Sequence, residues 1–329
     1  MRPQKTNIIG VAGANSRLVN EAGHTLSVSR TSSSTRNARI GAGDLTLINR
    51  GAMLINDVSL TVDTAGDFRN DGVIQKFGGS RDALFVDPTV INDCIVGIET
   101  GGTVVANDYR QDRGLTMIDG TLSVDVANID AGFVTGGGRL SGDLVNAGGV
   151  LSPGREIPGG LVDIFRVSGD YSQGAGATLF TDLAGSAPSE FDRLIVDGAA
   201  ALGGALAVSV DLAFAQTLTA GDRFRILETD FGITGDFAAI NDNIAGLDFS
   251  TVIDGNDLYL EVAGRGGTLS LASGAITARA PNFEDLAASK LAADPGGTEV
   301  EATGVPAPAS LPILLIGILA LAARRRHGG

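Results

Sequence analysis

Residues that could carry acid–base, nucleophilic or metal chemistry are few in this chain and widely separated. The two histidines, His24 and His327, lie far apart, and Cys94 is the single cysteine. Zinc sites need several His or Cys ligands at short spacing, and a Ser/His/Asp set needs a partnered histidine, so we predict neither. Cys94 cannot form an internal disulfide. Its apolar neighbours Ile95 and Val96 predict a small buried strand residue, with a reactive thiol as the alternative.

Carboxylates are the remaining candidates, because a polysaccharide lyase or hydrolase can work with carboxylates alone. Asp and Glu number 38, but they are scattered over expected strand ends and turns, where solvated or turn-forming roles are typical. Saccharide clefts favour stacking aromatics, whereas this chain has no Trp and three Tyr. The turn Asp254-Gly255-Asn256-Asp257 is similar to a calcium turn but lacks the terminal Glu of the calcium-binding loop. We therefore predict no catalytic residue, no cofactor and no metal site, and calcium binding stays open.

The composition predicts short strands joined by tight turns. Glycine contributes 47 of the 329 residues, without the three-residue period of collagen, and Val, Leu, Thr and Asp are abundant. The formal net charge of −14 excludes nucleic acid as a partner and suits solubility.

Residues 6–160 alternate apolar and polar side chains over short stretches, as half-buried strands do. The residues expected to point inward include Leu45, Leu47, Val58, Leu60, Leu122, Val124 and Val126. No stretch of this half sustains a helical period.

A longer repeat of about 20 residues overlies the alternation, in which apolar residues are followed by Asn and then Gly. It is clear at Asn20, Asn49, Asn70 and Asn146, with weaker copies at Asn92 and Asn128. A unit too short to bury its own core predicts a β-solenoid of stacked coils. The Asn residues would take left-handed turn conformations or form stacked amide ladders. An antiparallel sandwich with Asn-Gly hairpins is the alternative.

A break around Pro153-Gly154 and Pro158-Gly159 precedes longer strands in residues 161–264. Four tracts there are VSGDYSQGAGATLFTDLAG (167–185), FDRLIVDGAAALGGALAV (191–208), GDRFRIL (221–227) and DGNDLYLEV (254–262). These tracts resemble the closing region of autotransporter passenger proteins, which implies a second β-rich block without implying self-transport. Residues 265–304 predict a linker, in which Phe283, Leu286, Ala287 and Leu291 have the spacing of one short amphipathic helix.

Residues 305–329 join three pieces: a proline motif, an apolar run and a cluster of arginines. The proline motif is Val305, Pro306, Ala307, Pro308 and Ala309. The apolar run is Leu311, Pro312, Ile313, Leu314, Leu315, Ile316, Gly317, Ile318, Leu319, Ala320, Leu321, Ala322 and Ala323, and the basic anchor is Arg324, Arg325 and Arg326. This run makes roughly 20 Å of helix, and starting at Val305 brings it close to the ~30 Å bilayer core. We predict a membrane helix with the arginines on the cytoplasmic side, and a terminal core helix is the alternative.

This three-part tail resembles the PEP-CTERM class of bacterial sorting signals, in particular its VPLPA-CTERM variant, with Ala307 in place of the leucine. The resemblance implies recognition by an exosortase, a membrane-embedded protease of Gram-negative envelopes. Residues 1–10 contain no apolar signal-peptide core, although such a tail requires export. We expect the true start of the protein to lie upstream.

The sequence thus predicts an all-β fold, with a right-handed parallel β-solenoid (β-helix) over residues 1–160. A β-rich block (161–264), a linker (265–304) and one C-terminal transmembrane helix within the sorting tail (305–329) follow. The predicted function is that of an exported structural, adhesive or matrix-associated protein of the cell surface. It would be tethered to the inner membrane until processed, with extracellular polysaccharide as a further partner. Alternatives are a polysaccharide lyase or hydrolase on a β-helix, and a membrane-anchored binding module.

Overall fold

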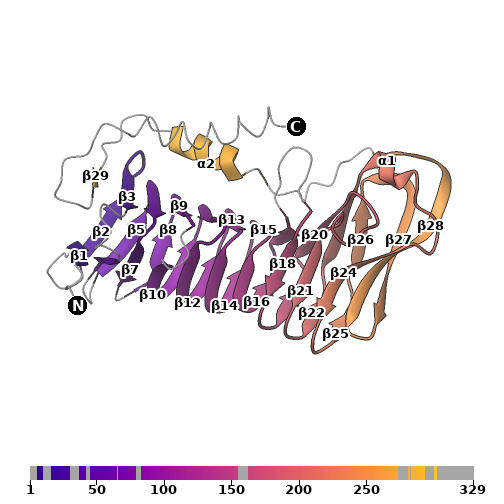
Figure 1. The fold of residues 1–329 in the computed structure, drawn as a ribbon, viewed down its shortest axis with the longest axis horizontal. Helices are drawn as coiled ribbons and strands as arrows, with labels where there is room; N and C mark the ends of the chain where they lie inside the picture. The colour runs from indigo at the N-terminus through magenta and orange to yellow at the C-terminus, as the bar shows by residue number, and fades with distance from the viewer. Residues whose placement is uncertain are drawn as a thin grey trace.

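The protein is a parallel β-solenoid closed at one end by an antiparallel hairpin (Figure 1). The computed structural model describes residues 6–9, 16–29, 37–41, 45–64, 66–78, 83–154, 162–272, 281, 283–292 and 300–301. Within these residues the chain makes ten coils, and each coil supplies a strand segment to each of three parallel ladders. This pairing confirms the predicted β-solenoid and excludes the antiparallel sandwich for residues 6–154.

The first ladder is β1 (Thr6–Ile9), β4 (Asn37–Ile40), β7 (Ser59–Asp63), β10 (Ala83–Asn92), β12 (Thr103–Gln111), β14 (Thr121–Ile129), β16 (Arg139–Asn146), β18 (Ile164–Val167), β21 (Arg193–Val196) and β24 (Arg223–Thr229). The second is β2 (Ser16–Asn20), β5 (Leu45–Asn49), β8 (Phe68–Asn70), the second halves of β10, β12, β14 and β16, then β19 (Tyr171–Gln173), β22 (Ala200–Leu202) and β25 (Ile233–Gly235). The third is β3 (Thr25–Ser29), β6 (Ala52–Asn56), β9 (Val73–Lys76), β11 (Ile95–Ile98), β13 (Leu115–Ile118), β15 (Phe133–Gly136), β17 (Val150–Pro153), β20 (Thr178–Leu183), β23 (Ala205–Val210) and β26 (Ala239–Asp242).

The ladders continue across the break around residue 160. β18 pairs with β16, and β20 pairs with β17, both in parallel. The described residues from 162 to 242 therefore add coils to the solenoid that residues 6–154 begin.

Alternation of side chains fills the interior, as the period of two predicts. Leu45, Leu47, Val58, Leu60, Leu122 and Val124 are all buried. Val126 is half-exposed, so its predicted inward position is wrong. The register of β14 shifts between Ser123 and Val126, and the extra residue turns Val126 outward while Ala127 and Ile129 fill the core.

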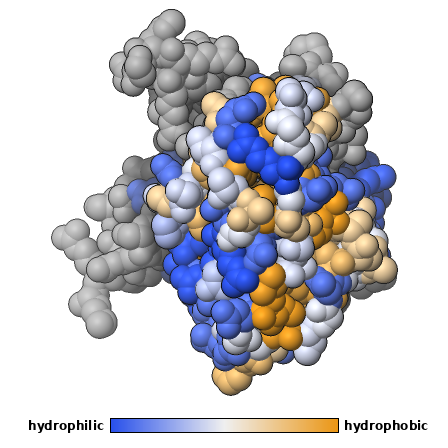
Figure 2. Space-filling view, turned by 90° about the vertical axis from the view of Figure 1, so that its right-hand side faces the viewer, coloured by the Kyte–Doolittle hydropathy of each residue, from blue (hydrophilic) through white to orange (hydrophobic). Residues whose placement is uncertain are grey.

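The far end of the solenoid is covered by β27 (Ile244–Asp254) and β28 (Asp257–Leu271), which form an antiparallel hairpin. β28 also pairs antiparallel with β24, so the hairpin ends the parallel first ladder. A short helix, α1 (Leu212–Ala215), contacts both hairpin strands, and the side chain of Asp211 caps its first N–H groups. The end view in Figure 2 shows apolar patches between polar side chains, and exposed Phe231, Ile253 and Leu271 lie in this part of the chain.

The third ladder is buried on both of its faces over several coils. All four residues of β9, β11 and β13 are buried, because helix α2 (Phe283–Ala292) packs on the outer face there. α2 contains the four residues whose spacing predicts a helix in the linker. Strand β29 (Val300–Glu301) follows and pairs in parallel with β3.

In the part of the chain that the structure describes, no helix is long and apolar enough to span a bilayer. The sorting tail predicted at residues 305–329, including its membrane helix, lies outside the described residues.

Candidate functional site

A row of amide side chains, interrupted once, runs along the solenoid where the second ladder turns into the third. In-register pairing aligns one residue per coil at this place. We call this row the amide ladder; its members are Asn20, Asn49, Asn70, Asn92, Gln111, Asn146 and Gln173, with Ile129 between Gln111 and Asn146. All of them except Asn20 are buried.

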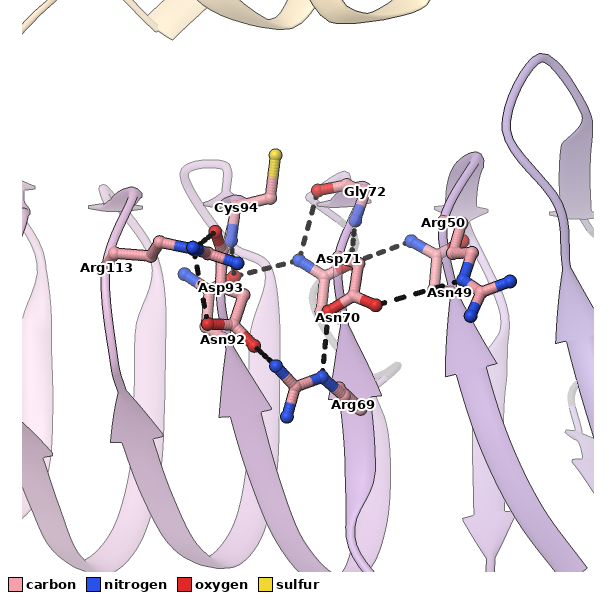
Figure 3. Close-up of polar contacts among 10 residues, drawn as sticks. All are labelled: Asn49, Arg50, Arg69, Asn70, Asp71, Gly72, Asn92, Asp93, Cys94 and Arg113. Carbon is pink, nitrogen blue, oxygen red and sulfur yellow. Dashed lines mark hydrogen bonds and ion pairs between the residues drawn. The ribbon is translucent and has the colours of Figure 1, made fainter.

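The asparagines of successive coils are bonded side chain to side chain. Nδ2 of Asn20 donates to Oδ1 of Asn49 over 2.7 Å. Asn49 donates in the same way to Asn70 over 2.8 Å, and Asn70 to Asn92 over 2.9 Å (Figure 3). Pairing of polar atoms stabilises a buried amide, so these bonds hold the four coils that contain Asn20, Asn49, Asn70 and Asn92 in one register.

The amides also bond main-chain groups near the turns, in the next coil or in their own. Nδ2 of Asn49 donates to the Val73 carbonyl over 3.0 Å, and Nδ2 of Asn70 to the Ile95 carbonyl over 2.9 Å. In the other direction, the Cys94 N–H donates to Oδ1 of Asn92 over 3.1 Å. These bonds therefore fix the main chain where each turn leads into the next strand.

The ladder confirms one prediction from the sequence and corrects another. Asn20, Asn49, Asn70, Asn92 and Asn146 lie where the repeat places them, as stacked amides. Among the described non-glycine residues only Asp57 has a positive φ, so the left-handed alternative does not apply to these asparagines.

Asn128 is not a member of the ladder, because Ile129 occupies that position and adjacent strand residues point to opposite faces. The sequence reasoning also missed Gln111 and Gln173. Both precede the same glycine-containing turn as the asparagines, so a repeat that accepts either amide would include them.

Two buried tyrosines extend the polar network into the core. The Tyr171 hydroxyl donates to Oε1 of Gln173 over 2.7 Å. Tyr109 shares a hydrogen bond with the Thr116 hydroxyl, which donates to Oε1 of Gln111 over 2.6 Å. Burial raises the pKa of both tyrosines well above the ordinary value, because the phenolate would be desolvated.

A row of ion pairs runs along the outside of the same turns (Figure 3). We call it the ion ladder; its contacts are Arg50 with Glu21 at 3.2 Å, Arg50 with Asp71 at 3.9 Å, Arg69 with Asp71 at 2.9 Å, Arg69 with Asp93, Arg113 with Asp93 at 3.4 Å, and Arg110 with Asp130 at 3.1 Å. Most of these pairs join different coils, so the ion ladder repeats on the surface what the amide ladder does inside.

Asp93 is the most enclosed carboxylate of the ion ladder. Its side chain is 4% exposed, whereas that of Arg69 is 43% exposed. Partial burial disfavours the charged guanidinium, but the hydrogen bond to Asp71 and the charges of Asp93 and Asp112 raise the pKa of Arg69. The arginine therefore stays charged and holds two coils together.

Cys94 lies in this turn, half-buried, and not inside a strand as predicted. Asn92 ends β10, and its side chain binds the Cys94 N–H, so the chain turns before β11 begins. Burial raises the pKa of the Cys94 thiol, which favours the protonated form.

The residues predicted to form the sorting site, 305–309, 311–323 and 324–326, lie outside the described residues. Within the described part of the chain, no three His, Cys, Asp or Glu side chains are grouped so that they could hold a metal ion. The turn at Asp254 and Asp257 joins β27 to β28, and Asp257 pairs with Arg225 at 3.2 Å.

The fold and the two ladders define the class of this protein: a parallel β-solenoid with internal amide stacking. No protein-family model matches the chain, and no curated protein matches it in sequence.

Proposed function

We propose that this protein is an exported structural or adhesive component of the cell envelope, in which the solenoid is a stiff display rod. The proposal rests on one observation: the polar side chains along the turns are engaged in contacts between adjacent coils. Amides inside and arginine–carboxylate pairs outside bond one coil to the next. In this arrangement the carboxylates stabilise the stack, whereas a lyase or hydrolase would need them converging on a substrate.

The dimensions of the stack suit a spacer. Coils of parallel strands are spaced about 4.8 Å apart, so ten coils give a rod roughly 45 Å long. We propose right-handed winding for it, the handedness that parallel crossover connections nearly always have.

We further propose that residues 305–329 sort the protein. The apolar run 311–323 would insert in the inner membrane, the arginines 324–326 would stay on the cytoplasmic side, and an exosortase-type protease would recognise the proline motif. Release would then place the rod at the cell surface or in an extracellular polysaccharide matrix. Placing an arginine at the bilayer centre costs about 2.5–3.5 kcal/mol, which is why the basic cluster anchors the helix.

Fractionation of the expressing bacterium, with the mass of the C-terminus measured in each fraction, tests this proposal. The wild type should be exported and recovered shortened at its C-terminus. Replacing all three arginines by Asn should impair insertion and processing, whereas the charge-conserving Lys variant should behave as wild type. Pro306→Ala with Pro308→Ala should leave the full-length protein in the membrane, and Pro295→Ala in the linker is the matched control.

Three other outcomes would contradict the proposal. Soluble wild type with Gly329 intact would make the tail a core helix. Permanent retention of intact wild type in the membrane would favour an anchored binding module. Depolymerisation of a bacterial polysaccharide by the wild type, lost in an Asp→Asn or Glu→Gln variant, would favour the lyase or hydrolase.

A further inference from the structure

After the hairpin, the chain runs back along the outside of the solenoid. β28, the second strand of the hairpin, ends at Leu271. Further along the chain, α2 lies against β9 and β11, and β29 pairs with β3 in the first described coil. We call α2 and β29 the return segment. In Figure 1, α2 lies on the side of β9 and β13, and β29 lies near β3 at the N-terminal end of the solenoid.

A specific contact positions α2 on this face. Gly97 in β11 faces the ring of Phe283, and a Cβ added to Gly97 would come within 2.3 Å of that ring. Phe283 and Ala287 are buried together with Val73, Ile95, Leu115 and Met117, side chains that project outward from the third ladder. A glycine in the middle of a strand and apolar residues on its outer face are unfavourable unless another element covers them.

The end of the return segment has a defined partner. Val300 pairs with Leu26 and Glu301 pairs with Ser27, so β29 adds a strand to the edge of β3. Main-chain pairing at a free strand edge is a recurrent way to dock an extended segment.

From these contacts we propose that the return segment makes the chain leave the solenoid at the β1–β3 coil, so that this coil faces the membrane and the processing protease. The β27–β28 hairpin, with exposed Ile253 and Leu271, is then the outward contact end, about 45 Å away. The membrane part of this inference depends on the proposed function; the path of the return segment does not. Only residues 302–310 separate β29 from the apolar run, and nine residues span at most about 30 Å.

Cysteine cross-linking in the full-length protein tests the path. In a Cys94→Ser background, Ser27→Cys with Glu301→Cys should form an intramolecular disulfide under mild oxidation, because these residues are opposite each other across β3 and β29. The matched control is Asn241→Cys with Glu301→Cys, since Asn241 has the same register position in β26. Cross-linking of the control pair, or equal yields from both pairs, would overturn the proposed path.

A second variant tests the contact of Phe283 with Gly97. Gly97→Ala should displace the Phe283 ring and lower the yield of the Ser27–Glu301 cross-link several-fold, with the circular dichroism of the solenoid unchanged. Phe283→Ala should lower it in the same way, whereas Ser289→Ala, on the exposed side of α2, should not. Unchanged yields in both Gly97→Ala and Phe283→Ala would show that the contact of α2 with β11 does not position the return segment.

The orientation of the solenoid relative to the membrane is measured by energy transfer. The protein carries one fluorophore, and the acceptor dye lies in the membrane of spheroplasts. The Pro306→Ala/Pro308→Ala form is used because it should stay anchored in the membrane. A label at Ser29→Cys in β3 should transfer strongly, and one at Asp254→Cys in the hairpin turn weakly. Equal or reversed transfer in membrane-bound protein would overturn the orientation and leave the proposed sorting intact. Absence of the protein from the membrane would overturn both the sorting and the orientation, and the cross-link would still decide the path.

Discussion

At the scale of single residues, buried amides are the feature that separates this solenoid from an apolar stack. Asn70 is central to the amide ladder: it accepts from Asn49, and it donates to Asn92 and to the Ile95 carbonyl. Hydrocarbon at this position would remove one hydrogen bond from each of the two neighbouring amides and the bond to the Ile95 carbonyl. The ladder therefore makes the register of the coils specific, because a coil shifted by one residue would bury unpaired polar groups.

We predict that Asn70→Ala lowers the free energy of unfolding by about 2–4 kcal/mol, since it removes the buried hydrogen bonds of Asn70 with Asn49, Asn92 and the Ile95 carbonyl. Asn128→Ala, one residue before the ladder position and half-exposed, should change it by less than about 0.5 kcal/mol. Urea unfolding followed by circular dichroism measures both. Equal effects at Asn70 and Asn128 would mean that the stacked amides do not stabilise the fold.

The buried tyrosines predict how stability depends on alkaline pH. The folded-state pKa of Tyr109 and Tyr171 is raised above the ordinary 10.0, so their contribution to stability is complete below pH 10 and is lost as the pH rises above it. The Tyr109→Phe/Tyr171→Phe variant should start less stable at pH 8, by about 1–3 kcal/mol from lost hydrogen bonds. It should then lose less stability than wild type between pH 10 and pH 11, as thermal unfolding at each pH would show. Parallel curves for the two proteins would contradict the assignment.

At the scale of elements, the strands of adjacent coils are joined near the turns by two sets of side-chain contacts. The amide ladder lies inside the solenoid, and the ion ladder lies on its outside. Asp93 belongs to the ion ladder and directly follows Asn92 of the amide ladder. Its enclosed carboxylate is paired with Arg69 and Arg113 of the neighbouring coils. An exposed ion pair contributes little to stability, whereas an enclosed carboxylate that loses its partner is destabilising.

We predict that Arg69→Met destabilises the fold by about 1–2 kcal/mol, because Arg69 is itself partly exposed and Arg113 still faces Asp93. Arg113→Met should cost less than about 0.5 kcal/mol, since Arg113 is 70% exposed. In Arg69→Met/Asp93→Asn, part of the loss should be recovered, because the charge that lacks a partner is gone. A double-mutant cycle measures this coupling, and strict additivity would contradict it.

At the scale of the whole molecule, the solenoid is a nearly one-dimensional stack whose ends need covers. Each coil contacts chiefly its two neighbours, so an uncovered end exposes strand edges and core side chains. At one end the β27–β28 hairpin provides the cover by turning the last ladder antiparallel.

We predict that Leu260→Asp, which places a carboxylate at a fully buried position of β28, opens this end. The expected result is a loss above about 4 kcal/mol, with proteolysis starting in the last coils and concentration-dependent aggregation. Ala245→Asp, at an exposed position of β27, is the control and should behave as wild type. Limited proteolysis with mass spectrometry locates the first cuts, and first cuts in the β1–β3 coil would contradict the role of the hairpin.

Local patterns in the amino-acid sequence predict the parallel coils and most of the amide ladder. The alternation around Leu45, Leu60 and Leu122 is a local signal of half-buried strands. The recurrence of Asn20, Asn49 and Asn70 indicates the length of a coil, because equivalent positions must stack. The helical spacing of Phe283 and Ala287 is also local, and α2 forms there.

Features that depend on contacts between distant segments are not visible in local sequence patterns and become apparent in the folded chain. The bulge in β14 turned Val126 outward and made Ile129, not Asn128, the ladder residue, and a bulge is a property of pairing that alternation does not report. The apolar residues Ile95 and Leu115 point outward from the third ladder, and a period of two cannot tell an outward residue covered by a helix from one in the core. Likewise, Val300 and Glu301 carry no strong strand signal of their own. They form β29 because the edge of β3 offers unpaired main-chain groups, and the free energy of that pairing depends on residues 274 positions earlier in the chain (300 − 26).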